Sequence, residues 1–209
     1  VWGLAYIRKV FHSCDKPSCP VCYKYGWAPR EAGKIEERLA EASKRFGQVE
    51  HIVCSVPVRD YGLGYDVLRH RVVKVLRDRG VIGGVLIFHG FRYSLREWWY
   101  WSPHFHVLGF IAGGYRCRGC KRKCFKGCEG FDNRNYRCYE KDGYVVKVLG
   151  KRKTIGGTAW YQLNHSSIDI TKKRFHVSTL FGVVSYRKLK IESGGSRRYV
   201  CPVCGHNLE

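Results

Sequence analysis

Methionine is absent from this sequence, acidic residues are scarce, and no apolar run approaches the length of a membrane-spanning helix. The chain begins at Val1 without a signal peptide, so we expect a piece of a longer cytoplasmic protein that has no membrane partner. Only 17 aspartate and glutamate residues oppose 38 lysine and arginine residues, which gives a net charge of +21. Such an excess is unusual for an enzyme of small molecules and indicates a polyanionic partner, nucleic acid above all.

Cysteine is abundant, and its spacing indicates metal binding rather than disulfides. The 11 cysteines are odd in number and several stand in C-x-x-C pairs, in a chain without a secretory signal. Thiolates at this spacing are typical of structural zinc sites. We expect zinc knuckles at residues 12–22 and 199–206 and a zinc-binding insertion at 115–142, with the ligands Cys14, Cys19, Cys22, Cys117, Cys120, Cys124, Cys128, Cys138, Cys201 and Cys204.

The pairing of these cysteines stays open. Cys14, Cys19 and Cys22 are one ligand short of a tetrahedral zinc site, and His12 could complete it. Equally, Cys19 and Cys22 could combine with the two C-terminal cysteines in one zinc ribbon that ties the two ends of the chain together.

The pattern of apolar residues predicts one α+β domain over residues 1–209, in which a central antiparallel sheet is flanked by helices. Helices are predicted over residues 30–46, 65–79 and 158–168, the last with Thr158 as its cap. Strands are predicted over residues 49–57, 84–93, 99–111, 144–149 and 177–186, and Cys54 is expected to be a buried core thiol. The strands over 84–93 and 99–111 should form a hairpin, and Pro103 indicates an edge position or a bulge.

Two histidines stand on either side of one bulky apolar residue in the strand predicted over 99–111. Because side chains alternate across a strand, His104 and His106 should point to one face of the sheet and Phe105 to the other. The two imidazoles are then about 7 Å apart along the strand. This arrangement allows both to bind a single metal ion.

The helix predicted after residue 158 carries a second pair of interest. Tyr161 and His165 are four residues apart and should share one helix face. A phenolate can attack a phosphodiester and hold the released phosphate covalently. Since a free phenol has a pKa of about 10, it needs a cation that polarises the phosphorus and offsets the developing charge. Histidines on the sheet could hold that cation.

In this order, the motifs resemble those of the HUH endonuclease superfamily, whose members nick and rejoin single-stranded DNA. The residues that carry the resemblance are the strands around Phe88–Arg92 and Ser102–Gly109, the helix around Tyr161–His165, and the cysteine knuckles. It covers roughly residues 49–190, and it is greatest to the replication initiators of archaeal plasmids and small archaeal viruses. The resemblance implies a ferredoxin-like or RRM-like antiparallel sheet flanked by helices.

The resemblance also implies roles for individual residues. His104 and His106 would bind a catalytic Mg²⁺ or Mn²⁺, and Tyr161 would form a 5′-phosphotyrosine and free a 3′-hydroxyl. The third metal ligand stays open between two histidines. His89 lies about opposite His104 in the predicted hairpin, and His165 follows Tyr161 by one helical turn.

Other residues of the same types fit these roles less well. Glu97 falls in the turn of the hairpin, which makes it a weaker ligand candidate. Tyr144 and Tyr186 have no histidine at helical spacing, so we expect a single nucleophilic tyrosine. Sites rich in imidazole also bind Zn²⁺, Ni²⁺ or Co²⁺ readily.

Basic residues around the predicted site indicate a path for a single strand of DNA. The candidates for nucleic-acid binding are Arg92, Lys151, Arg152, Lys153, Lys172, Lys173 and Arg174. Together with Trp98, Trp99, Trp101 and Trp160 they could line a channel that binds phosphates and stacks bases. Taken singly, each tryptophan is more typical of a core.

The resemblance therefore implies a rolling-circle replication initiator that nicks and joins single-stranded DNA at a replication origin, with host replication proteins as candidate partners. A transposase or a mobilisation relaxase would use the same chemistry. A different class also fits the sequence: a zinc-ribbon protein that binds nucleic acid without catalysis, in which the histidines are structural.

Overall fold

A six-stranded antiparallel sheet forms the centre of the computed structural model, which describes residues 18–94, 98–111, 138–149, 154–166 and 177–191 and the backbone of residues 199–200 and 207–208. The strand order is β4-β5-β1-β3-β2-β6. The strands are β1 (Glu50–Ser55), β2 (Val81–Tyr93), β3 (Trp99–Ile111), β4 (Cys138–Lys141), β5 (Tyr144–Leu149) and β6 (Ser178–Gly182). Two short strands, β7 (Tyr199–Val200) and β8 (Asn207–Leu208), form a separate ribbon.

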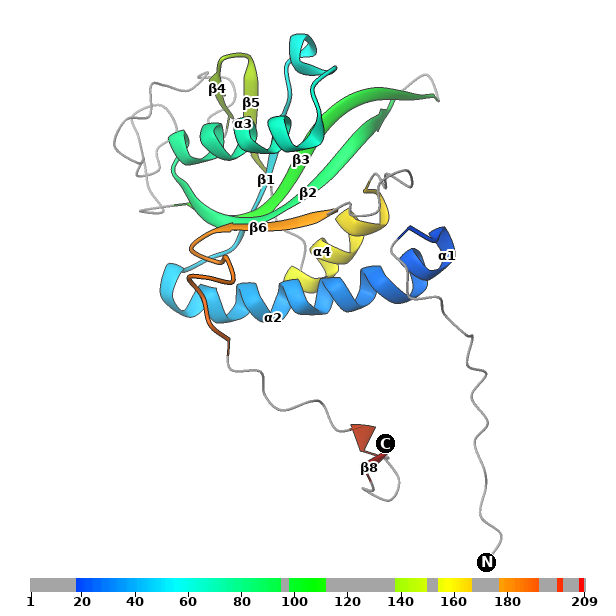
Figure 1. The fold of residues 1–209 in the computed structure, drawn as a ribbon. Helices are drawn as coiled ribbons and strands as arrows, with labels where there is room; N and C mark the ends of the chain where they lie inside the picture. The colour runs from blue at the N-terminus through cyan, green and yellow to red at the C-terminus, as the bar shows by residue number, and fades with distance from the viewer. Residues whose placement is uncertain are drawn as a thin grey trace, which may run out of the picture.

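Helices cover both faces of the sheet (Figure 1). One face carries α3 (Tyr65–Asp78), and the other carries α2 (Ala28–Phe46) and α4 (Ile155–Asn164). A short helix α1 (Pro20–Cys22) and a π-helical turn η1 (Tyr23–Trp27) lead into α2, and a 3-10 turn η2 (Val58–Asp60) follows β1. The α+β architecture predicted from the sequence, an antiparallel sheet flanked by helices, is confirmed.

Two apolar cores result from this layering. The core under α3 contains Phe105 and Val107 of β3, and the core under α2 and α4 contains Leu108 and Phe110 of the same strand. The helices turn apolar residues inward at helical spacing, for example Ile35 and Leu39 in α2, with their polar residues outward. The buried thiol of Cys54 lies in the first core, as predicted, and burial raises its pKa.

The hairpin of β2 and β3 contains a bulge that decides which side chains share a face. His89 pairs with His104, but the next pair towards the turn is Phe91 with Trp101, so Gly90 faces both Ser102 and Pro103. The bulge predicted from Pro103 is therefore present. The edge position predicted as its alternative is wrong, since β3 lies between β1 and β2. The bulge accommodates a residue that has no N–H to donate within a central strand.

Several other predicted boundaries are corrected. The insertion predicted over 115–142 ends earlier, because Cys138–Lys141 pairs with β5 and Tyr139 is buried in the core. Thr158 lies inside α4, and the hydroxyl of Thr154 caps the helix by accepting a hydrogen bond from the N–H of Gly157. The last strand ends at Gly182, whose positive φ turns the chain.

Most of the cysteines predicted to bind zinc lie outside the described residues: Cys14, Cys117, Cys120, Cys124, Cys128, Cys201 and Cys204. Cys138 is described by its backbone, at the start of β4. Cys19 and Cys22 are half-buried and stand at the two ends of α1. Zinc binding by these residues stays a prediction.

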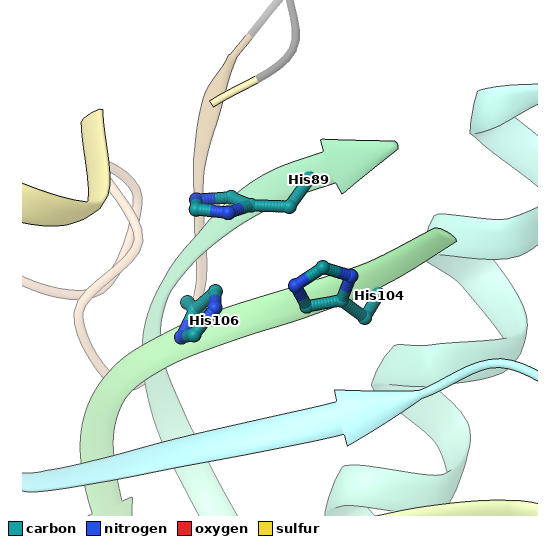
Figure 2. A group of neighbouring side chains, drawn as sticks. All are labelled: His89, His104 and His106. Carbon is teal, nitrogen blue, oxygen red and sulfur yellow. The ribbon is translucent and has the colours of Figure 1, made fainter. Parts of the chain in front are cut away.

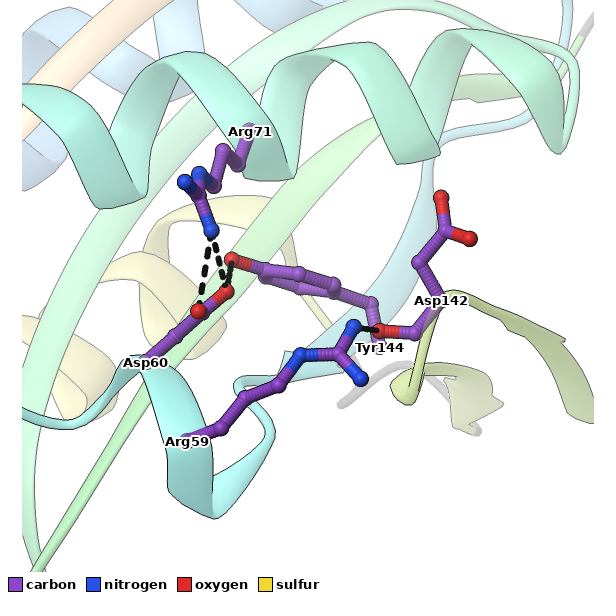
Figure 3. A network of polar contacts seen from close by, with 5 residues as sticks. All are labelled: Arg59, Asp60, Arg71, Asp142 and Tyr144. Carbon is purple, nitrogen blue, oxygen red and sulfur yellow. Dashed lines mark hydrogen bonds and ion pairs between the residues drawn. The ribbon is translucent and has the colours of Figure 1, made fainter.

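A buried carboxylate ties η2, α3 and β5 together on the α3 side of the sheet (Figure 3). Asp60 accepts hydrogen bonds from Arg71, at 2.9 Å to both carboxylate oxygens, and from the hydroxyl of Tyr144. Arg59 donates to the carbonyl of Asp142 close by. Burial by itself would raise the pKa of Asp60, but the hydrogen bonds and the two guanidinium charges lower the pKa overall.

We expect Tyr144→Phe to lower the free energy of unfolding by about 1–3 kcal/mol, because a buried carboxylate loses one of its donors. Since the pKa of Asp60 is lowered on folding, the contribution of the network is present above about pH 4 and is lost as the pH falls below that. Urea unfolding at pH 7 measures the change. Tyr25→Phe, at an exposed tyrosine, is the control and should change stability by less than about 0.5 kcal/mol. Equal stability of the two variants would contradict the role of the network.

Candidate metal centre

The two histidines of β3 lie on the face of the sheet that α2 and α4 cover. Phe105, between them, packs in the core under α3, whereas Leu108, two residues beyond His106, packs under α2 and α4. His104 is buried and His106 is half-buried. The prediction that both imidazoles share a face opposite to Phe105 is confirmed.

A third histidine reaches the same place from the neighbouring strand. His89 of β2 is the cross-strand partner of His104, as the hairpin predicted. One ring nitrogen of each of His89, His104 and His106 lies within 4.8 Å of the others (Figure 2). The ring of His89 is centred 5.2 Å from that of His104 and 4.4 Å from that of His106. The three residues form a group that could bind a metal ion, which we call the histidine triad.

Each imidazole of the histidine triad also has an outer hydrogen-bond partner. His104 Nδ1 donates to the carbonyl of Ser102 at 2.8 Å, and His89 Nε2 donates to the carbonyl of Gln162 at 2.9 Å. His106 Nδ1 lies 3.0 Å from Nε2 of His51. A neutral imidazole has one N–H, so a nitrogen that donates outward leaves the other with a lone pair. This pattern of outer contacts is typical of metal-binding histidines, whose orientation it fixes.

His51 is the contributor that sequence reasoning missed. Its ring stacks on that of His106, with centroids 5.2 Å apart, and its Nε2 also lies 3.4 Å from the side-chain amide of Gln162. When Nδ1 of His106 donates to Nε2 of His51, His106 keeps its own Nε2 for a metal. No motif marks His51 in the sequence. Its position follows only from the pairing of Val53 with His106, because His51 stands two residues before Val53 in β1 and therefore shares its face of the sheet.

Burial keeps the histidine triad uncharged. It lowers the pKa of His89 to about 3 and that of His104 to about 4, and it lowers the pKa of His106 further. The neighbouring imidazoles add to the effect for His89 and His106, and the charge of Arg92 adds to it for His104 and His106. Neutral imidazoles are the form that binds metal, so the donor set fits a divalent cation at neutral pH.

Helix α4, which carries the predicted tyrosine, contacts this centre through another residue. Gln162, the residue after Tyr161, contacts His89 through its carbonyl and His51 through its amide. The helix is fixed near both ends. The N–H of Gly156 donates to Glu36 of α2 at 3.1 Å, and the hydroxyl of Tyr23 donates to the carbonyl of Leu163 at 2.8 Å.

Tyr161 and His165 share a face of α4, as predicted. Their rings are centred 4.4 Å apart, and Nδ1 of His165 donates to the carbonyl of Tyr161 at 2.7 Å. Tyr161 is 37% exposed. His165 lies outside the histidine triad, although its charge contributes to the lowered pKa of His89. The structure thus brings His89 together with His104 and His106. A ligand role for His165 and the nucleophilic role of Tyr161 stay predictions.

The remaining candidates are placed as follows. Arg92 is half-buried and donates to the hydroxyl of Ser55 at 2.7 Å. Its charge lowers the pKa of His104 and His106. Tyr144 is buried in the opposite core, and the ring of Tyr186 faces the guanidinium of Arg38. Outside the described residues lie Glu97, Lys151, Arg152, Lys153, Lys172, Lys173 and Arg174.

The four tryptophans proposed to line the channel are exposed. The expectation that each one, taken singly, is a core residue is therefore wrong. Trp98, Trp99, Trp101 and Trp160 are between 42% and 62% exposed. Three of them stand at the turn end of the β2–β3 hairpin, where the sheet extends beyond the helices (Figure 1).

Comparison with known proteins does not assign the chain to a family: no family model, no curated protein and no solved structure matches it. Within the described ranges, none of the helices has the length and apolar character needed to cross a lipid bilayer.

Proposed function

We propose that this chain is a metal-dependent endonuclease and strand transferase for single-stranded DNA, the nicking domain of a rolling-circle replication initiator of the HUH type. One observation carries the proposal. Three neutral imidazoles from adjacent strands meet on one face of the sheet, and the helix with the candidate nucleophile contacts His89 of this group and the neighbouring His51 through Gln162. A bound cation and a tyrosine nucleophile are the combination that transfer through a phosphotyrosine uses.

In this proposal, His89, His104 and His106 hold the divalent cation, which when bound polarises the scissile phosphate and offsets negative charge. Tyr161 Oη attacks phosphorus, and the bond from phosphorus to the 3′-oxygen breaks. The electron pair leaves with that oxygen, which takes up a proton, while the phenolic proton passes to solvent. The products are a 5′-phosphotyrosine and a free 3′-hydroxyl, and the reverse attack by a 3′-hydroxyl rejoins the strand.

An all-histidine donor set bears on the choice of metal. The resemblance implies Mg²⁺ or Mn²⁺, but Mg²⁺ prefers oxygen ligands, whereas imidazole suits Zn²⁺, Ni²⁺ and Co²⁺. We infer that Mn²⁺ supports cleavage better than Mg²⁺, and that Co²⁺ or Ni²⁺ can replace it in the test tube. Structural zinc at the cysteines would be a separate site.

The net charge of +21 supports DNA as the substrate, because a basic surface gains affinity from phosphates by releasing counterions. Arg92 lies beside the histidine triad, where it could contact the scissile strand. We propose that a replication origin is the site of action, in the cytoplasm, with host replication proteins as later partners.

Wild-type protein should cleave some members of a pool of single-stranded oligonucleotides with separate fluorophores at the 5′ and 3′ ends. With Mn²⁺, the 5′ label should appear on a shorter strand and the 3′ label should migrate with the protein on a denaturing gel, since the protein keeps the 5′-phosphate. EDTA should abolish both species and added Mn²⁺ should restore them. Binding of the pool without cleavage by any of these metals would contradict the proposal and favour a non-catalytic zinc-ribbon protein.

The sequences selected from the pool separate the remaining alternatives. A single origin-like site, cleaved and rejoined in isolation, supports a replication initiator. A requirement for two paired end sequences would indicate a transposase, and a requirement for a transfer origin would indicate a mobilisation relaxase.

A further inference from the structure

Six large aromatic side chains are exposed at the turn end of the β2–β3 hairpin. Their exposed fractions lie between 42% and 62%, for Phe91, Tyr93, Trp98, Trp99, Tyr100 and Trp101. Nothing in the nicking chemistry uses them. Two facing pairs, Phe91 with Trp101 and Tyr93 with Trp99, are in ring contact, and we call these four residues the aromatic platform. Since exposed aromatic groups that are contiguous mark interaction sites, the platform calls for a ligand.

The aromatic platform is ordered by the same strand pairing that builds the metal centre. Beyond the pair of His89 and His104 come the pairs of Phe91 with Trp101 and of Tyr93 with Trp99. The rings of these two pairs are centred 5.2 Å and 5.3 Å apart. Because two residues of a strand span about 7 Å, the two pairs are spaced at an interval comparable with one nucleotide of an extended single strand.

The base of the platform is fixed to the core. The indole N–H of Trp101 donates to the carbonyl of Tyr61 at 3.0 Å, and the ring of Trp101 meets Phe88 edge-on at 6.4 Å. At the other end, the N–H of Ser94 donates to the carbonyl of Trp98 at 2.9 Å and closes the hairpin. The aromatic surfaces are therefore held in place before a ligand arrives, which lowers the entropic cost of binding.

We propose that the aromatic platform, which lies on the α3 side of the hairpin where Trp101 contacts Tyr61 and Phe88, stacks two or three bases of a bound single strand without regard to their sequence. The inference rests on the proposed function. Aromatic rings accept any base, because every base has a π-face, and the positive charge of the chain attracts the phosphates between the bases. The same charge disfavours a second copy of this chain as the occupant, because two molecules of +21 repel each other.

The test uses Tyr93→Ala/Trp99→Ala, which removes the outer pair and leaves Trp101 in place on the core. We expect its affinity for a fluorescent 15-mer of thymidines, measured by anisotropy in EDTA on the full chain, to fall about 10–100-fold. Trp99→Phe, with Tyr93 unchanged, keeps an aromatic ring at this position and should retain most of the wild-type affinity. Tyr25→Ala removes an exposed aromatic side chain from η1 and should bind like the wild type.

A second ligand shows whether stacking is responsible. A 15-mer of abasic sugar-phosphate keeps the charge and has no bases, so wild-type protein should bind it more weakly than the thymidine strand. The double variant should distinguish the two strands less well than the wild type does, because only the pair of Phe91 and Trp101 remains to stack bases. If the variant loses affinity for both strands by the same factor, or if wild-type protein does not distinguish them, the platform does not stack bases and the inference is overturned.

Failure of the inference and failure of the proposed function give different results. Wild-type nicking with unchanged thymidine affinity in the double variant would overturn the platform alone. If the double variant loses affinity for the thymidine strand but the wild-type protein nicks no strand with any metal, the platform is retained and the endonuclease is rejected. A wild-type dimer in sedimentation that the double variant abolishes would overturn base stacking in favour of self-association.

Discussion

His104→Ala should reduce cleavage of single-stranded DNA by at least about 10³-fold and should remove tight Mn²⁺ binding. Its imidazole is held by the carbonyl of Ser102 and faces two further imidazoles, so alanine removes one of three ligands. His106→Ala should behave in the same way. Single-turnover cleavage on a denaturing gel measures the first effect, and calorimetric titration with Mn²⁺ measures the second.

The outer contacts predict a graded series around the same centre. Loss of a direct ligand should lower Mn²⁺ affinity by more than about 100-fold, whereas His51→Ala should lower it about 10–100-fold, because His51 orients His106 without being a member of the histidine triad. The thermal midpoint gives an independent readout. Mn²⁺ should raise it in the wild type, since it binds only the folded protein, and should leave it unchanged in His104→Ala.

The control is His70→Ala, at an exposed histidine on α3. It should keep wild-type cleavage and Mn²⁺ affinity. A His104→Ala protein that remains folded by circular dichroism and cleaves at the wild-type rate would reject the metal centre. If instead His51→Ala proves more damaging than His104→Ala, His51 is itself a ligand and the assignment of the triad is wrong.

The bulge explains how far the sequence could predict this centre. A regular hairpin that pairs Tyr93 with Trp99 would continue to His89 opposite Pro103, and His104 would then face Phe88. Since cross-strand partners share a face and a slip of one residue exchanges the faces, His89 and His104 would lie on opposite sides. The extra residue in β3 brings them together. The sequence predicts the hairpin from the strand pattern and a bulge, as one of two alternatives, from Pro103.

What the sequence could not predict depends on contacts between distant segments. His51 has no motif around it, and its role follows from the pairing of β1 with β3. Gln162 reads as an ordinary helical residue, yet its carbonyl and amide join α4 to the sheet. A tryptophan taken singly is more typical of a core, and the sequence offers no sign that three of these side chains are exposed because the hairpin extends beyond the helices that cover the sheet.

Tyr161→Phe should abolish the covalent protein–DNA adduct while DNA binding is retained. The substitution removes only Oη, the atom proposed to attack phosphorus, and keeps the ring that lies 4.4 Å from His165. Helix α4 should not move, because it is held through Glu36, Tyr23 and Gln162. The 3′-labelled adduct on a denaturing gel and the affinity for an uncleaved strand are the two measurements.

Peptide mapping of the wild-type adduct should place the nucleotide remnant on Tyr161. Tyr186→Phe, at an exposed tyrosine remote in sequence, should form the adduct at the wild-type level. An adduct that persists undiminished in Tyr161→Phe would transfer the nucleophilic role to another residue, while the metal centre would stand.

The two variants should separate metal binding from nucleophilic attack. Tyr161→Phe retains all three imidazoles and their outer partners, so its Mn²⁺ affinity and its thermal shift should equal those of the wild type. His104→Ala retains the phenol and should form no adduct, since nothing then polarises the phosphate or offsets its charge. If Tyr161→Phe lowered Mn²⁺ affinity as strongly as His104→Ala does, the phenol would be a ligand of the metal rather than the group that attacks phosphorus.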